Sequence, residues 1–177
     1  ERPTSTQQTG FSYVAQLRSW LPREIGGILW FGNDDGNMVA YVPIYCSNTE
    51  RAECFNTPGA DAVTFSDKNA FWVCNWVSNM TYPRYSQLFP ALKEVRDSIE
   101  NSYFAAQKDV EAKALALYAS DKAAAVKYLN GYSIKKSDEM IARWRQLAIY
   151  MIVKFNDMAV KPEKEGKFLR TPTGLGE

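Results

Sequence analysis

The chain has 177 residues, enough for one well-buried core, and its 46% hydrophobic and 23% charged residues are ordinary for a globular domain. Its net charge of +1 gives no electrostatic reason to expect a nucleic-acid or membrane partner, and no apolar run approaches the ~20 residues that a membrane span needs. The chain has no histidine, which excludes Ser-His-Asp and Cys-His catalysis and His-containing zinc sites within it; its three cysteines lack C-x-x-C spacing, so we expect no metal and no cofactor.

The beginning of the chain carries patterns that predict antiparallel strands. After a polar lead-in over 1–9, the residues of 11–17 alternate between two faces, which is typical of a strand. An apolar run over 28–31 and a β-rich run over 38–45 flank the loop Gly-Asn-Asp-Asp-Gly-Asn, so we expect these runs to form a hairpin. A turn-rich segment over 46–69 follows.

A further strand is expected over 70–77, Ala-Phe-Trp-Val-Cys-Asn-Trp-Val. The runs at 28–31 and 70–74 are apolar at successive positions and not at alternate ones. Strands of this kind are covered on both faces, by helices or by a second sheet. A four-layer helix–sheet–sheet–helix sandwich would supply that cover.

Amphipathic helices are predicted next. Pro90 suits a first helical turn, and an apolar stripe at three- and four-residue intervals follows it: Leu92, Val95, Ile99, Tyr103 and Ala106. We expect this helix to run towards Ala119, with a break near Ser120-Asp121.

Two further helices are expected after that break. The first begins at Lys122 and ends at Asn130-Gly131, and the second is capped by Ser137. The apolar side of this last helix comprises Met140, Ile141, Trp144, Leu147, Ala148, Met151, Ile152 and Phe155. We therefore predict an α+β fold over residues 1–177, as a single domain or domain fragment: a strand-rich part over 1–86, a helical part over 87–159, and a loop and tail over 160–177.

Three segments together resemble the cysteine-type dipeptidases, relatives of the secernins within the N-terminal-nucleophile (Ntn) hydrolases. They are Q-L-R-x-W-L-P at 16–22, G-G-x-L-W-F-G at 26–32 and Y-V-P-I-Y at 41–45. The resemblance implies an αββα sandwich and metal-free dipeptide hydrolysis through a thioester. Its nucleophile is a cysteine whose own α-amine, with a pKa of about 7.7–8, acts as the base.

Residue 1 is Glu1, which cannot provide that chemistry. We therefore expect the C-terminal region of a dipeptidase, inactive alone, with the nucleophilic cysteine upstream in a missing N-terminal part. The expected partners are a dipeptide substrate, that missing part, and a second copy if the apolar sheet is otherwise exposed.

The resemblance makes Arg18, in the Gln16-Leu17-Arg18 corner, a candidate to clamp the carboxylate of the substrate. The alternative, which the position at a strand end favours, is a structural ion pair. Asn33, Asp34 and Asp35 are candidates for a cation or an α-ammonium group, and also typical turn formers.

The three cysteines leave two possibilities open. Cys46 and Cys54, eight residues apart across a polar loop, form a disulfide in an oxidising compartment or remain free thiols in a reducing one. A bridge would favour a periplasmic or secreted protein, and its absence a cytoplasmic one. Cys74 lies in an apolar run and is expected to be buried.

The alternative hypothesis is a non-catalytic binding module for a glycan or a protein. It would use an aromatic-rich sheet face, with side chains drawn from Trp20, Trp30, Phe31, Tyr41, Tyr45, Phe71, Trp72 and Trp76.

Overall fold

The computed structural model describes residues 4–170 and has the α+β class that the sequence predicts. Glu1 and the tail after Arg170 lie outside the described residues. The strands are β1 (Phe11–Leu17), β2 (Gly27–Asn33), β3 (Val42–Tyr45), β4 (Glu163–Lys164) and β5 (Lys167–Phe168). The α-helices are α1 (Arg23–Gly26), α2 (Ala70–Thr81), α3 (Tyr85–Tyr118) and α4 (Lys122–Phe155).

The sheet has the antiparallel order β1-β2-β3, which confirms the predicted strand at 11–17 and the predicted pairing of 28–31 with the following run. Tyr13 pairs with Phe31 in β2, and Phe31 pairs with Val42 in β3. Only 42–45 of the expected second strand is extended. The buried residues 38–40 belong to the connecting loop.

The two faces of the sheet have different surroundings. Even-numbered residues of β2, Ile28 and Trp30, are buried on the side of the long helices. The odd-numbered residues of β1 lie on the other face, where Leu17 is 76% exposed. That outer face is itself apolar: it carries Phe11, Tyr13, Ala15, Leu17, Leu29 and Ile44.

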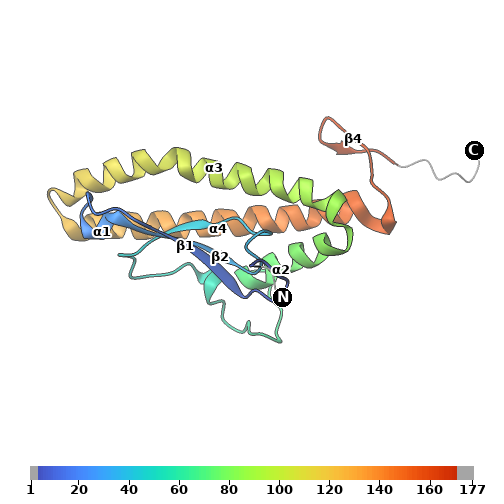
Figure 1. Cartoon of the computed structure of the whole chain (residues 1–177), viewed down its shortest axis with the longest axis horizontal. Coiled ribbons are helices and arrows are strands. Elements are labelled where there is room, and N and C mark those ends of the chain that lie inside the picture. Colours follow the sequence, from blue (N-terminus) through green and yellow to red (C-terminus); the bar gives the residue numbers. More distant parts are fainter. Residues whose placement is uncertain (1–3, 171–177) are drawn as a thin grey trace, which may run out of the picture.

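The long helices α3 and α4 lie side by side along the long axis of the molecule, with the strands packed along them (Figure 1). They are joined over residues 119–121, where the sequence predicts a break. Asp121 caps α4, accepting hydrogen bonds from the amides of Ala123 at 2.9 Å and Ala124 at 3.1 Å. No helix among residues 4–170 is both long enough and apolar enough to cross a membrane.

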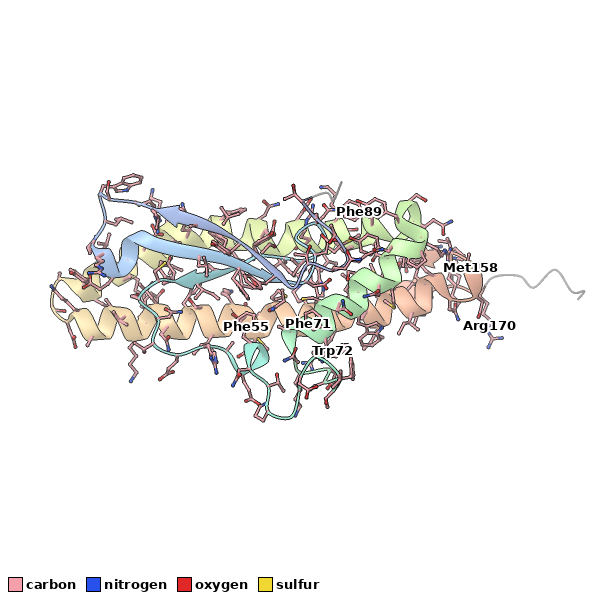
Figure 2. The ribbon with its side chains drawn as sticks, turned by 60° about the horizontal axis from the view of Figure 1, so that its bottom comes forward. Phe55, Phe71, Trp72, Phe89, Met158 and Arg170 are labelled. Atoms are coloured by element: carbon pink, nitrogen blue, oxygen red, sulfur yellow. The ribbon has the colours of Figure 1, made fainter. Side chains whose placement is uncertain are left out.

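The prediction of a strand over 70–77 is wrong, because this segment forms helix α2. Its buried residues follow the helical period: Ala70, Val73, Cys74, Val77, Ser78 and Thr81. Asn69 caps it by accepting from the amide of Trp72 at 3.4 Å. The aromatic residues between those positions made the run look continuously apolar. Figure 2 shows Phe71 and Trp72 close to Phe55, where the loop over 46–69 returns to the helices.

The predicted stop at Asn130-Gly131 is also wrong, because α4 continues unbroken to Phe155. Ser137 is not a cap. It is buried inside the helix, and its hydroxyl donates to the carbonyl of Ser133 at 2.9 Å. Burial of Leu129, Met140 and Trp144 on either side outweighs the cost of about 1 kcal/mol of a glycine within a helix.

Pro90 lies at the sixth position of α3 and not in its first turn. The helix begins at Tyr85, whose ring stacks on that of Phe89 at 4.6 Å, and Leu88 is buried. Near the end of the chain, the expected loop contains the short hairpin β4–β5, which turns through the positive φ of Glu165 and Gly166.

Candidate functional site

The predicted Gln16-Leu17-Arg18 corner forms a cleft at one end of the sheet. β1 ends at Leu17, the chain makes the single turn α1, and β2 begins at Gly27. A cavity of about 820 Å³ opens there, lined by Leu17, Arg18, Ser19, Leu21, Arg23, Glu24, Gly26, Gly27, Cys46 and Ser47. The chain turns this tightly because residue 26 has no side chain: a Cβ there would lie 2.6 Å from the carbonyl oxygen of Arg18.

Arg18 is held by the protein itself. Its buried guanidinium pairs with Glu111 of α3, while Nε donates to the carbonyl of Gly26 at 3.3 Å and Nη2 to that of Ile25 at 3.2 Å. These contacts correspond to the structural ion pair that the sequence left open. Binding of a substrate carboxylate by Arg18 stays a prediction. It would use the guanidinium N–H groups that do not take part in these hydrogen bonds.

Glu111 is the centre of a buried polar network that joins this corner to β1. Its Oε1 accepts from Gln107 Nε2 at 3.0 Å and from the hydroxyl of Tyr45 at 3.4 Å. Gln107 also donates to Gln16 Oε1 at 3.2 Å, and Trp30 Nε1 donates to the same oxygen at 3.0 Å. Burial, reinforced by the nearby Glu111 carboxylate, raises the pKa of Tyr45 far above its usual range, so its hydroxyl stays protonated as a donor.

A second hollow, the β1–α3 groove, lies on the helix-facing side of the same network. Its volume is about 420 Å³, and its lining consists of Val14, Ala15, Gln16, Trp30, Tyr41, Glu100, Phe104 and Gln107. Glu100 accepts from the amide of Tyr41 at 3.0 Å, and burial raises the pKa of its carboxyl group. The groove is therefore mostly apolar, with one carboxylate in its wall.

Sequence reasoning missed the residues of α3 that build both hollows. Glu100, Phe104, Gln107 and Glu111 recur at intervals of four, three and four residues, so they share one face of the helix. Each directly follows, or lies one turn from, the buried stripe Ile99, Tyr103, Val110 and Ala114. Polar residues flanking an apolar stripe at helical spacing were the available signal.

The acidic pair after β2 is buried and acts within the fold. Asp34, at φ 70°, accepts from Asn75 Nδ2 at 2.9 Å and from the hydroxyl of Ser78 at 2.5 Å, which ties the loop after β2 to α2. Asp35 accepts from the hydroxyls of Ser5 and Tyr82, and burial raises its pKa.

The neighbouring Asn33 lies at the end of β2, and no described donor reaches its buried Oδ1. Within residues 4–170, no set of three or more histidine, cysteine or acidic side chains is arranged to hold a metal ion. Binding of a cation or ammonium group by these three residues stays a prediction.

All three cysteines are free thiols in the structure. Cys46 is exposed in the corner cleft, beside Gly27, whereas Cys54 and Cys74 are buried. Burial raises the pKa of Cys54 to about 12 and that of Cys74 well above its ordinary value, so neither is a thiolate near neutrality. The Cys46–Cys54 bridge is not formed here and stays a prediction.

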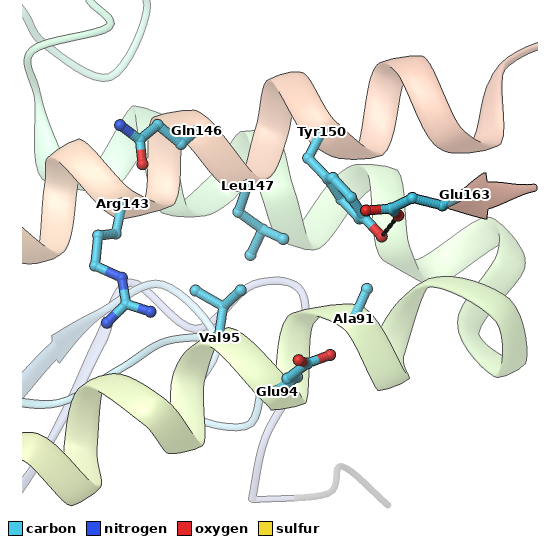
Figure 3. Close-up of a pocket in the computed structure, with 8 residues that line it drawn as sticks. All are labelled: Ala91, Glu94, Val95, Arg143, Gln146, Leu147, Tyr150 and Glu163. Carbon is cyan, nitrogen blue, oxygen red and sulfur yellow. Dashed lines mark hydrogen bonds between the residues drawn. The ribbon is translucent and has the colours of Figure 1, made fainter. Parts of the chain in front are cut away.

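A further hollow of about 340 Å³ lies between α3 and α4 (Figure 3). Its floor is apolar, with Val95 and Leu147, and Glu94 and Arg143 stand at its rim. Tyr150 closes one end by donating to Glu163 Oε2 at 3.0 Å. It shares no residue with the corner cleft or the β1–α3 groove.

Comparison with known proteins gives one family. The model of peptidase family C69 matches residues 1–98, more than half of the 177 residues. The matched region contains the sheet, the corner cleft, the acidic pair, α2 and the first turns of α3. No curated protein matches the chain. The resemblance that the three segments of β1 to β3 suggested is confirmed, and the chain belongs to peptidase family C69.

Proposed function

We propose that this chain is a region of a dipeptidase and supplies one sheet and one helical layer of its four-layer sandwich. The nucleophile of that enzyme is a cysteine with a free α-amine, in a part of the enzyme outside these 177 residues. The observation that carries this proposal is the apolar outer face of a sheet within the family-matched region. In an αββα sandwich, that face is the one on which the second sheet packs.

The environments of the three cysteines support a nucleophile elsewhere. A thioester mechanism needs a thiolate, and a neighbouring base must take the proton of the thiol before it attacks the carbonyl carbon. Cys54 and Cys74 are kept protonated by burial. Cys46 is exposed, but its position within the chain gives it no α-amine, and the chain has no histidine to serve as the base.

The corner cleft is the part of this region that we assign to the substrate. It lies where β1 ends and β2 begins, and its lining includes Arg23 beside Glu24, and Arg18, whose guanidinium is paired with Glu111. A dipeptide carries its ammonium group on its first residue and its carboxylate on its second, so a guanidinium of this wall would fix its C-terminal end. The Glu111 network would hold Arg18 in place for that purpose.

The alternative, a binding module with an aromatic sheet face, is supported less by the arrangement of the side chains. Trp30 and Tyr45 are buried on the helix-facing side of the sheet, and Trp20 is exposed alone. Trp72 and Trp76 lie on α2, around Phe65. Phe31 lies on the outer face of the sheet, stacked on Phe11, so the aromatic residues named for this alternative are divided between the two faces of the sheet and α2.

The test is hydrolysis of a panel of unblocked dipeptides, measured by chromatography of the released amino acids. We expect no turnover by the 177-residue chain alone, and turnover by the complete gene product that a thiol-alkylating reagent abolishes. Hydrolysis by the chain alone that Cys46→Ser removes would place the nucleophile in this chain. A complete, folded product that hydrolyses no dipeptide would overturn the proposal.

A further inference from the structure

The β1–α3 groove has an unusual combination of one carboxylate and apolar walls. Glu100 is the one charged residue among those that line it. Its Oε1 accepts from the amide of Tyr41 at 3.0 Å, and its Oε2 accepts no hydrogen bond from residues 4–170. The nearby cation Arg96 is already engaged: it donates to Asp97 and to the carbonyl of Asn37. The carboxylate therefore keeps one oxygen for an outside donor.

The walls of the groove suit an aromatic or branched aliphatic group. The ring centroids of Trp30 and Phe104 lie 4.9 Å apart, and the two rings are tilted relative to each other. Trp30 is buried, and Phe104 is more than half exposed. Val14 of β1 is exposed beside them. An apolar side chain placed there would cover Phe104 and Val14 and remove their surfaces from water.

The side-chain amides of Gln16 and Gln107 are fixed by the network, and in each of them one polar atom has no hydrogen-bond partner among the described residues. Gln16 Oε1 accepts two hydrogen bonds and Gln107 Nε2 donates two, which settles the orientation of both amides. Gln16 Nε2 and Gln107 Oε1 have no partner among the described residues. They offer a donor and an acceptor, as a peptide group requires.

We propose that this groove binds a primary ammonium group borne beside an aromatic or branched aliphatic side chain, as at the first residue of a peptide. The ammonium group contacts Glu100, and the side chain lies against Phe104 and Val14. The assignment is made from the groove alone and does not depend on peptide hydrolysis by the complete enzyme.

The experiment is calorimetric titration of the purified chain with L-phenylalaninamide, which carries both features. N-acetyl-phenylalaninamide lacks the charge, and glycinamide lacks the side chain. We expect the first ligand to bind at least about tenfold more tightly than either of the others. A hydrogen bond to a charged group contributes about that factor, which the acetylated ligand loses, and burial of a phenyl ring contributes at least as much, which glycinamide loses. Equal affinity for the acetylated ligand, or no binding of phenylalaninamide to the wild-type chain, would overturn the proposal.

Two variants test whether phenylalaninamide binds in this groove. Glu100→Gln keeps an acceptor for the Tyr41 amide and is expected to weaken phenylalaninamide at least about tenfold. Glu94→Gln removes the same charge from α3, but in the hollow of Figure 3, and is the matched control. An equal loss in both variants would overturn the assignment. Phenethylamine and Phe-Gly-Gly then distinguish the source: tighter binding of the tripeptide identifies a peptide, and tighter binding of phenethylamine a simple amine. The site is retained in both cases.

Discussion

Replacing Glu111 by methionine tests the buried ion pair that holds the corner cleft. The side chains of Arg18 and Glu111 are only 7% and 14% exposed, so the change leaves a buried guanidinium without its counter-ion. Gln107 and Tyr45 lose the same acceptor. Methionine keeps the length and helix propensity of the position. Removing one partner of a buried pair costs about 3–5 kcal/mol, a large part of the stability of a domain of this size.

The measurement is urea unfolding followed by far-ultraviolet circular dichroism. We expect the free energy of unfolding to fall by about 3–5 kcal/mol with an unchanged slope, and the melting temperature to fall by roughly 6–20 °C. In the double variant Arg18→Met/Glu111→Met, apolar side chains replace both charges, so its loss should be smaller than the sum of the two single losses.

A matched control comes from the same helix. Lys93 and Asp97 form an exposed ion pair on α3, with the Lys93 side chain 54% exposed, so Lys93→Met should leave the unfolding midpoint unchanged. A Glu111→Met protein within about 0.5 kcal/mol of the wild type would refute the reasoning. So would a double variant whose loss equals the sum of the single losses, because the two charges would then not be coupled.

Three further predictions use other parts of the fold. Burial raises the pKa of Glu100 above its ordinary value of 4.5, so the stability linked to its protonated form is fully present below pH 4.5 and is lost as the pH rises through the raised pKa. The variant Glu100→Gln carries no charge at any pH. Its stability relative to the wild type, measured by urea midpoints, should therefore be higher at about pH 7 than at about pH 4. Cys46 should react with a maleimide in the folded chain, while Cys54 and Cys74 react only after unfolding. An oxidised preparation in which Cys46 is blocked and the mass is lower by two hydrogen atoms would instead establish the disulfide. Gly26→Ala should destabilise the chain by about 1–3 kcal/mol, because its Cβ would meet the backbone oxygen of Arg18, whereas Gly131→Ala in the open middle of α4 should stabilise it by up to about 1 kcal/mol; equal thermal shifts would contradict this.

The sheet was predictable from the sequence because its signal is local. The alternation over 11–17 assigns Phe11 and Tyr13 to one face and Ser12 and Val14 to the other, and the structure has that division. The loop at 32–37 indicated that its flanking runs pair. The sequence did not show where β3 begins. Residues 38–40 are rich in β-forming side chains, but they are buried in the loop before β3, and this burial and not β-propensity determines the start of the strand.

The errors arose where tertiary packing overrides a local signal. Continuous apolar sequence at 70–77 suits a buried strand or a buried helix, and periodicity alone does not separate them. Gly131 and Ser137 resemble the boundaries of two helices, but they lie within α4, which is buried along much of its length against α2 and β3. A single sequence does not reveal those neighbours.

The sequence predicted one part of the candidate site and missed the other, because the missed residues depend on tertiary packing. The family resemblance made Arg18 a candidate, its place directly after a strand suggested an ion pair, and that ion pair exists. Its partner, Glu111, is 93 residues away on α3, and Gln107 is 91 residues from Gln16. Contacts at such separations depend on how α3 lies on the sheet, which no local spacing encodes.

The arrangement of β1 connects these observations with the proposed function. On its inner face, Gln16 accepts hydrogen bonds from Gln107 of α3 and from Trp30 of β2. Its outer residues are apolar and exposed, and the seven residues of this edge strand include no charge and no proline. Proteins usually protect such an edge with lysine, proline or a covering element, because an unprotected apolar strand pairs with other chains. The free edge of β1 is therefore expected to pair with a further strand in the working state, and its exposed apolar side chains are expected to be covered, which supports a second sheet over this face.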